Sequence, residues 1–91
     1  MLYIVAYDIS DDRRRLRLSK ALLDFGDRVQ YSVFECLLDT NSMVKMTRRI
    51  SDIIDMEEDS VRVYPLCAGC EKKATIIGTG TRTKDPEIYI L

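Results

Sequence analysis

The pattern of apolar positions opens with a strand and continues into a helix. Residues 2–9 are apolar on both faces and rich in aromatic and β-branched side chains, which predicts a buried strand, Leu2–Ile9, with a carboxylate, Asp8, at its end. Ser10, Asp11 and Asp12 then offer side chains that cap a helix. The helix is predicted from about Asp11 to Phe25, because apolar residues recur there at helical spacing: Leu18, Ala21, Leu22 and Phe25.

Five further strands and helices are expected between the first helix and the C-terminus. Gly26 suits the left-handed position that ends the first helix. The further elements expected are, in order, a strand Arg28–Leu38, a helix that begins near Thr40–Ser42 and ends in the acidic turn Asp55–Asp59, a strand Ser60–Leu66, a loop Cys67–Lys73, a short strand Ala74–Ile77 and a last strand Glu87–Leu91.

This order predicts an α+β fold of the ferredoxin-like β-α-β-β-α-β kind with an additional C-terminal strand, as one domain over residues 1–91. In such a fold the helices cover one face of the sheet, and a solvated second face shows polar alternation. Leu2–Ile9 lacks that alternation, so we expect a second copy of the chain to cover the other face. The last strand is expected either to pair with the partner's sheet or with its own.

Composition and charge limit the binding and catalytic functions that the chain could have. The net charge is −1, but Asp11–Lys20 holds five basic and two acidic residues, so a polyanion could bind locally. The chain has no histidine, which excludes Ser-His and Cys-His catalytic pairs and leaves a metal or another base for any phosphodiester cleavage. The apolar run Leu2–Ala6 is too short for a membrane span, and three cysteines without a secretory signal favour a reducing, cytoplasmic location.

Asp8 is the leading candidate for chemistry. Carboxylate oxygens are the ligands that Mg²⁺ and Mn²⁺ prefer. One carboxylate is too few for a firm site, but a two-fold axis would bring a second Asp8 and allow the pair to hold a hydrated ion. The alternative is an aspartate that caps the following turn.

The arginines that follow are candidates for phosphate contact, since guanidinium groups bind phosphate oxygens bidentately. Arg13, Arg17 and Lys20 share one helix face, with Arg14 and Arg15 beside them. The alternative is a solvated helix face whose arginines pair with Asp11, Asp12 or Asp24. The acids of Asp55–Asp59 are interpreted as a solvated surface.

Four segments together carry a family resemblance: YIVAYDISDDRRRLRLSKAL, RVQYSVFEC, EEDSVRVYPLC and DPEIYIL. In this order and at this spacing they resemble the second-numbered family of CRISPR-associated proteins. The resemblance implies a ferredoxin-like homodimer, a metal-dependent nuclease acting on RNA or double-stranded DNA, and a partnership with the Cas integrase. It also implies a metal role for Asp8, phosphate contacts from Arg15 and Arg17, and activity-linked positions at Tyr7, Arg28 and Phe34. For Tyr7 and Phe34 packing is the favoured role.

Cys67 and Cys70 form a Cys-x-x-Cys motif. Two thiolates cannot complete a structural zinc site, and no histidine is present to help, so only two copies of the motif in a dimer could supply four ligands. A redox site is disfavoured because the motif is expected to leave a strand without opening a helix, so two ordinary loop thiols are expected.

Three functions remain open at this point. The first is a divalent-metal phosphodiesterase with Asp8 as the metal residue. The second is a non-catalytic dimer that holds DNA and bridges integrase subunits. The third is a regulatory module that binds a small ligand, which would have no affinity for nucleic acid.

Overall fold

The structure, a computed structural model, describes residues 1–78. Its elements follow in the order β1 (Leu2–Asp8), α1 (Asp12–Leu22), β2 (Asp27–Gln30), β3 (Val33–Leu37), α2 (Thr40–Ile53), β4 (Ser60–Leu66) and α3 (Ala68–Lys72). Up to β4 this is the predicted β-α-β-β-α-β order, and the α+β class is confirmed. The strand predicted at Glu87–Leu91 lies outside the described residues.

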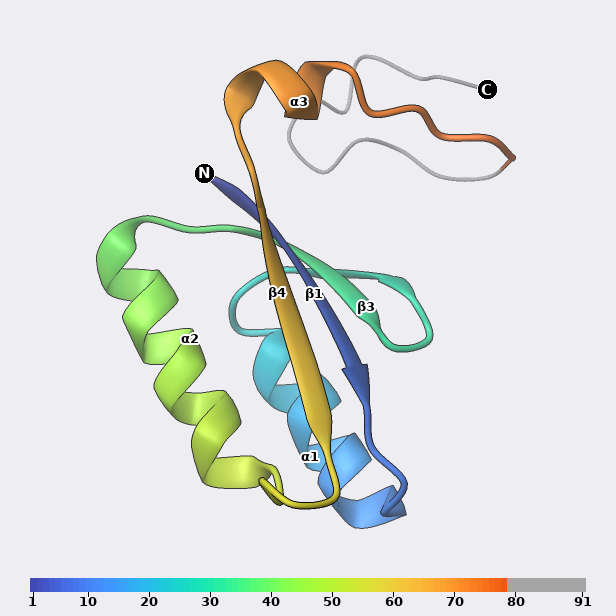
Figure 1. The fold of residues 1–91 in the computed structure, drawn as a ribbon, viewed down its shortest axis with the longest axis vertical. Coiled ribbons are helices and arrows are strands. Elements are labelled where there is room, and N and C mark those ends of the chain that lie inside the picture. The colour runs from blue at the N-terminus through green and yellow to red at the C-terminus, as the bar shows by residue number, and fades with distance from the viewer. Residues whose placement is uncertain (79–91) are drawn as a thin grey trace.

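The four strands form one antiparallel sheet in the order β2-β3-β1-β4 (Figure 1). β1 lies between β3 and β4, with Ala6 opposite Val33 on one side and opposite Arg62 on the other. The end of β1 is paired only with β4, where Asp8 lies opposite Ser60. The central strand therefore carries its terminal carboxylate beyond the β3 pairing.

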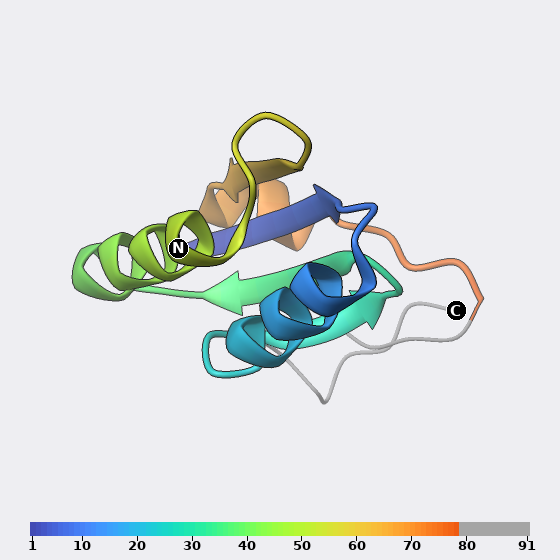
Figure 2. The same cartoon turned by 90° about the horizontal axis from the view of Figure 1, so that it is seen from below.

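One face of the sheet holds the core. Helices α1 and α2 lie side by side on this face (Figures 1 and 2). The largest fully buried side chains come from both layers and are Phe34, Leu18, Leu22, Met46, Val5 and Cys36. Both α1 and α2 have an aspartate as N-cap residue, and its side chain accepts a backbone hydrogen bond. Asp11 accepts from the Arg14 amide at 2.9 Å and Asp39 from the Ser42 amide at 2.7 Å.

The predicted strand Arg28–Leu38 is wrong as a single element, because the structure divides it into the hairpin β2–β3. The chain turns at Tyr31 and Ser32, and the register shifts between Arg28 and Gln30. No glycine or asparagine marks this turn, and apolar residues alternate through it from Val29 to Val33.

The prediction that Gly26 has a left-handed backbone is also wrong. Among residues 1–78 the only glycine with positive φ is Gly78. A Cβ on Gly26 would overlap the Glu35 carbonyl oxygen and lie 2.6 Å from the Cys36 sulfur. Gly26 is therefore needed for the close approach of the chain after α1 to β3. The helix α1 itself ends at Leu22, earlier than the expected Phe25.

The segment after β4 also differs from expectation. Cys67–Lys73, expected as a loop, contains the short helix α3. Ala74–Ile77, expected as a strand, pairs with none of the four strands, and Ile77 is 90% exposed. Among the described residues we find no helix with the length and apolar character needed to cross a bilayer.

Candidate functional site

Asp8 lies at the end of β1 on the sheet face that the helices leave uncovered. Its side chain alternates with those of Tyr7 and Val5, which are buried in the core on the opposite face. Asp8 is exposed, and its carboxylate makes no hydrogen bond or ion pair with any residue of the range 1–78. The following helix is capped by Asp11, so the structure does not give Asp8 the capping role considered as the alternative.

Residues 1–78 of one chain do not by themselves form a metal site. In the part of the chain that the structure describes, no group of three or more histidine, cysteine, aspartate or glutamate side chains could hold an ion. The donors available at the end of β1 are those of one free carboxylate, which suits Mg²⁺ or Mn²⁺ in chemistry but not in number. The residues therefore fit a metal only if a second chain adds its own Asp8.

The uncovered sheet face is apolar at the end far from Asp8 and becomes more polar toward Asp8. Leu2, Leu37 and Leu66 form one row across it, and Leu37 is 42% exposed. Nearer to Asp8 the rows include Tyr64, 48% exposed, and Arg62, whose Nη1 donates to the Tyr64 hydroxyl at 3.4 Å. A face with this much exposed apolar surface is the kind that a second protein covers.

Arg62 is a charged residue near Asp8 that the sequence reasoning missed. It lies opposite Ala6, two positions before Asp8 on the same face of β1. The signal was present in the alternation of Ser60–Leu66, where Val61 and Val63 pack against the core and Arg62 and Tyr64 are exposed.

A second group of candidate residues gathers at the β2–β3 turn, around the backbone carbonyl of Tyr31. Arg28 donates to this oxygen from Nε at 3.1 Å and from Nη2 at 2.6 Å, and its guanidinium carbon lies 5.3 Å from the centre of the Tyr31 ring. The Tyr7 hydroxyl donates to the same oxygen at 3.4 Å. Burial raises the pKa of Tyr7 above its ordinary value, partly opposed by the nearby charge of Arg28.

Arg15 approaches the same turn from α1. Its guanidinium donates to the Ile9 carbonyl at 2.9 Å, to the Ser10 carbonyl at 3.5 Å and to the Asp12 carboxylate. Hydrogen bonding to Asp12 raises the pKa of Arg15, with a smaller contribution from Tyr31. Arg15 therefore holds the β1–α1 connection in place and remains a partly exposed cation beside the turn.

Arg14 points elsewhere, toward the acidic turn after α2. Its Nε donates to Asp59 at 2.8 Å and its Nη2 to Glu58 at 3.1 Å, while the Asp59 side chain has no exposed surface. The interpretation of Asp55–Asp59 as a solvated surface is therefore wrong for Asp59, which also accepts from the Asp55 amide at 2.8 Å. The hydrogen bond from Arg14 lowers the pKa of Asp59 and raises the pKa of Arg14.

The remaining predicted residues divide between solvent and core. Arg13, Arg17 and Lys20 are exposed on α1 and form no ion pair with residues 1–78, so they remain open to a phosphate backbone. Ser10 is exposed in the connection before α1. Phe34 has no exposed surface and its ring lies 6.3 Å from that of Tyr7, which supports packing as the role of both.

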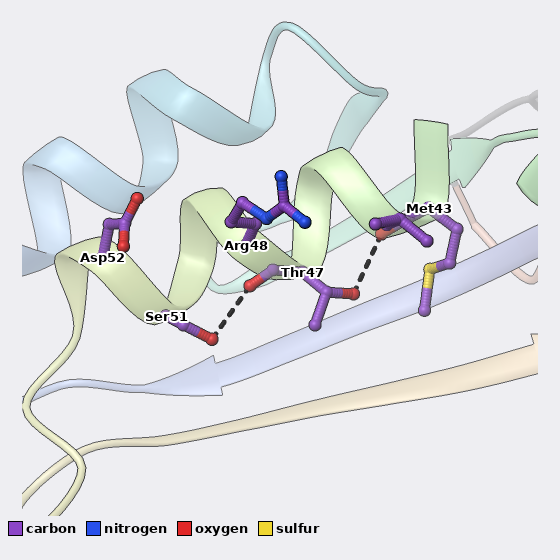
Figure 3. A pocket seen from close by; sticks show the side chains of 6 residues that line it. Met43, Thr47, Arg48, Ser51 and Asp52 are labelled. Atoms are coloured by element: carbon purple, nitrogen blue, oxygen red, sulfur yellow. Dashed lines mark hydrogen bonds between the residues drawn. The ribbon is translucent and has the colours of Figure 1, made fainter. Parts of the chain in front are cut away.

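A surface pocket of about 390 Å³ lies apart from these groups, along one side of α2 (Figure 3). Two hydroxyls in it, those of Thr47 and Ser51, donate to carbonyl oxygens of the helix itself, at 2.9 and 3.0 Å. None of the predicted site residues lines it.

The fold and the site define a class: a small α+β protein with a split β-α-β arrangement, a free carboxylate at the end of its central strand and arginines beside it. The family model described as "CRISPR associated protein Cas2" matches residues 1–74. The chain belongs to this family, as its sequence motifs indicated.

Individual relatives and solved structures support the same family membership. A protein of Synechocystis sp. named CRISPR-associated endoribonuclease Cas2 3 is 45% identical over 99% of this chain and 98% of its own length. One of Thermus thermophilus named CRISPR-associated endonuclease Cas2 2 is 40% identical over 99% and 96%. The crystal structure of Streptococcus pyogenes Cas2 at pH 6.5 matches with a TM-score of 0.76 at 32% identity, over 86% of this chain and all of that one. A chain in a structure titled "Partial Cas6-RT-Cas1--Cas2 complex" matches with a TM-score of 0.74 at 32% identity, over 84% and 89%.

Proposed function

We propose that this protein is a cytoplasmic homodimeric nuclease of CRISPR adaptation, dependent on Mg²⁺ or Mn²⁺ and acting on phosphodiester bonds of RNA or double-stranded DNA. The observation that carries the proposal is the exposed Asp8 carboxylate, which has no partner within residues 1–78 and lies beside a partly apolar sheet face. Two such faces in contact would pair the two Asp8 side chains. Relatives named as endoribonuclease and endonuclease support the same reaction class.

In the proposed site each chain has two tasks. Asp8 binds and orients the ion, which when bound would supply activated water and offset charge on the phosphate. Arg13 and Arg17, which are exposed and form no ion pair within residues 1–78, and Arg28 at the β2–β3 turn would contact phosphate oxygens without reading bases, which suits a substrate recognised by its backbone. Arg14 contributes mainly by joining α1 to the turn before β4.

A second function is favoured by one observation: each chain offers a single free carboxylate at the end of β1, and residues 1–78 hold no cluster of three ligands. The dimer would then act as a scaffold that holds the DNA duplex and bridges subunits of the Cas integrase. The similarity to a chain in a Cas1–Cas2 complex supports this partnership. In this case the exposed arginines matter and Asp8 does not.

The Asp8→Ala variant separates the two functions. We expect cleavage of RNA or duplex DNA in Mg²⁺ or Mn²⁺ to fall by about 100-fold or more, the loss typical when one group that stabilises the transition state is removed. Asp52→Ala is the matched control, because Asp52 is an exposed aspartate on α2, away from the sheet face. Cleavage by the control should be unchanged.

The same variant is tested for spacer acquisition in cells. Loss of cleavage with intact acquisition would assign the biological role to the scaffold. Persistent cleavage by Asp8→Ala would show that Asp8 is not the metal residue. Binding of duplex DNA that weakens steeply with salt excludes the small-ligand module.

A further inference from the structure

Cys67 and Cys70 lie in a different setting from the one that the sequence suggested. Strand β4 ends at Leu66, Cys67 follows as the N-cap residue of α3, and Cys70 lies one turn along that helix. The expectation that this Cys-x-x-Cys motif does not open a helix is therefore wrong. A strand that leads directly into a helix beginning at the motif is the arrangement in which such pairs carry out redox chemistry.

The two thiols differ in how easily they ionise. The Cys70 backbone amide donates to the Cys67 sulfur at 3.4 Å. Hydrogen bonding from Cys70 lowers the pKa of Cys67, and the neighbouring Cys67 thiol raises the pKa of Cys70. Both residues are exposed, so a disulfide reagent can reach either sulfur.

Cys36 provides an internal contrast. It has no exposed surface, and burial raises its pKa to about 11. A thiol in this state neither ionises near neutral pH nor meets a reagent in solvent. Among the three thiols, all within residues 1–78, only Cys67 and Cys70 are therefore available for reaction.

From this geometry we propose that Cys67 and Cys70 form a dithiol–disulfide exchange site whose substrates are small-molecule disulfides of the glutathione type. The Cys67 thiolate attacks one sulfur of the substrate, which forms a mixed disulfide and releases one thiolate. The Cys70 thiolate then attacks the Cys67 sulfur and releases the second. In sum, the protein dithiol loses two electrons and two protons, and the substrate disulfide becomes two thiols.

The test uses the full chain in buffers of increasing oxidised-to-reduced glutathione ratio, followed by maleimide labelling and intact mass spectrometry. The wild type should lose its Cys67 and Cys70 thiols together, with a mass decrease equal to two hydrogens and no glutathione attached, while Cys36 stays reduced. A disulfide between chains, a persistent glutathione adduct or unreacted thiols would each overturn the proposal.

Two serine variants test the order of attack. Cys70→Ser should accumulate glutathione on Cys67, because the resolving thiol is absent. Cys67→Ser should react about ten-fold more slowly, since a thiol with a raised pKa is less ionised. Equal rates in the two variants would refute the assignment of Cys67 as nucleophile. If the purified wild type retained Zn²⁺ on these cysteines, the redox proposal would be overturned and the motif would be a metal site. Circular dichroism of both variants checks that they fold.

Discussion

Gly26→Ala is expected to destabilise the protein through a collision with β3. The added Cβ would lie 2.6 Å from the Cys36 sulfur and 2.8 Å from the Cys36 Cα, and closer still to the Glu35 carbonyl oxygen. Two of these three atoms are backbone atoms of β3, where Glu35 is paired with both Ile4 and Asp27. The strand therefore cannot yield without disturbing the sheet on both sides.

The magnitude follows from two opposing effects. Overpacking of this kind costs about 1–3 kcal/mol. Replacing glycine by alanine lowers the entropy of the unfolded chain, which offsets about 0.4–1 kcal/mol. Because two of the clashing atoms are backbone atoms, the overpacking cost lies in the upper part of its range, and the net loss is about 1–2.5 kcal/mol, or a fall in Tm of about 5–20 °C for a domain of this size. Thermal unfolding followed by circular dichroism measures it, at fixed protein concentration because chain association raises stability.

Two further variants make the prediction specific. Gly69→Ala is the matched control, since its Cβ would meet only the Cys67 sulfur, at 4.0 Å, and it should leave Tm unchanged or slightly raised. Gly26→Asn distinguishes close approach from a left-handed backbone, which asparagine tolerates. Asparagine should be as harmful as alanine. A Gly26→Ala variant as stable as the wild type, or an asparagine variant clearly better than alanine, would refute the reasoning.

Three other outcomes are expected. Phe34→Ala should cost about 3–5 kcal/mol in urea unfolding, because a ring with no exposed surface is removed from the core; an unchanged midpoint would contradict the packing role. Tyr7→Phe should cost about 0.5–1 kcal/mol and spare cleavage, because its hydroxyl makes one long hydrogen bond, at 3.4 Å; lost cleavage in a folded variant would assign the hydroxyl a direct role. Since the pKa of Asp59 is lowered in the folded state, its stabilising effect is complete above the ordinary aspartate pKa of about 3.9 and is lost as pH falls below that value. Asp59→Asn should lower Tm at neutral pH and flatten the fall of Tm in acid; parallel curves for the two proteins would refute this.

The elements β1, α1, α2 and β4 could be predicted because their apolar periodicity is strong and local. The β2–β3 hairpin could not, since its turn at Tyr31 and Ser32 carries no glycine or asparagine and is held by a long-range hydrogen bond from the Tyr7 hydroxyl and nearby ones from Arg28. These bonds depend on the sheet order, which no local pattern reports.

The candidate site could also be predicted only in part from the sequence. Asp8 could be found because a carboxylate at the end of an apolar strand is visible in sequence. The division of the arginines could not, because the partner of Arg14 is Asp59, 45 residues away. The acidic turn around Asp59 has a solvated composition, and only the folded structure brings one of its carboxylates into a buried ion pair.

The stoichiometry of Mn²⁺ binding tests the central claim most directly, namely that two chains share one ion through their Asp8 side chains. Electron paramagnetic resonance of Mn²⁺ titrated into the wild type and into Asp8→Asn should give one bound ion for each pair of chains in the wild type and none at that site in the variant. Equal binding by both proteins, or one ion held by each separate chain, would contradict the account.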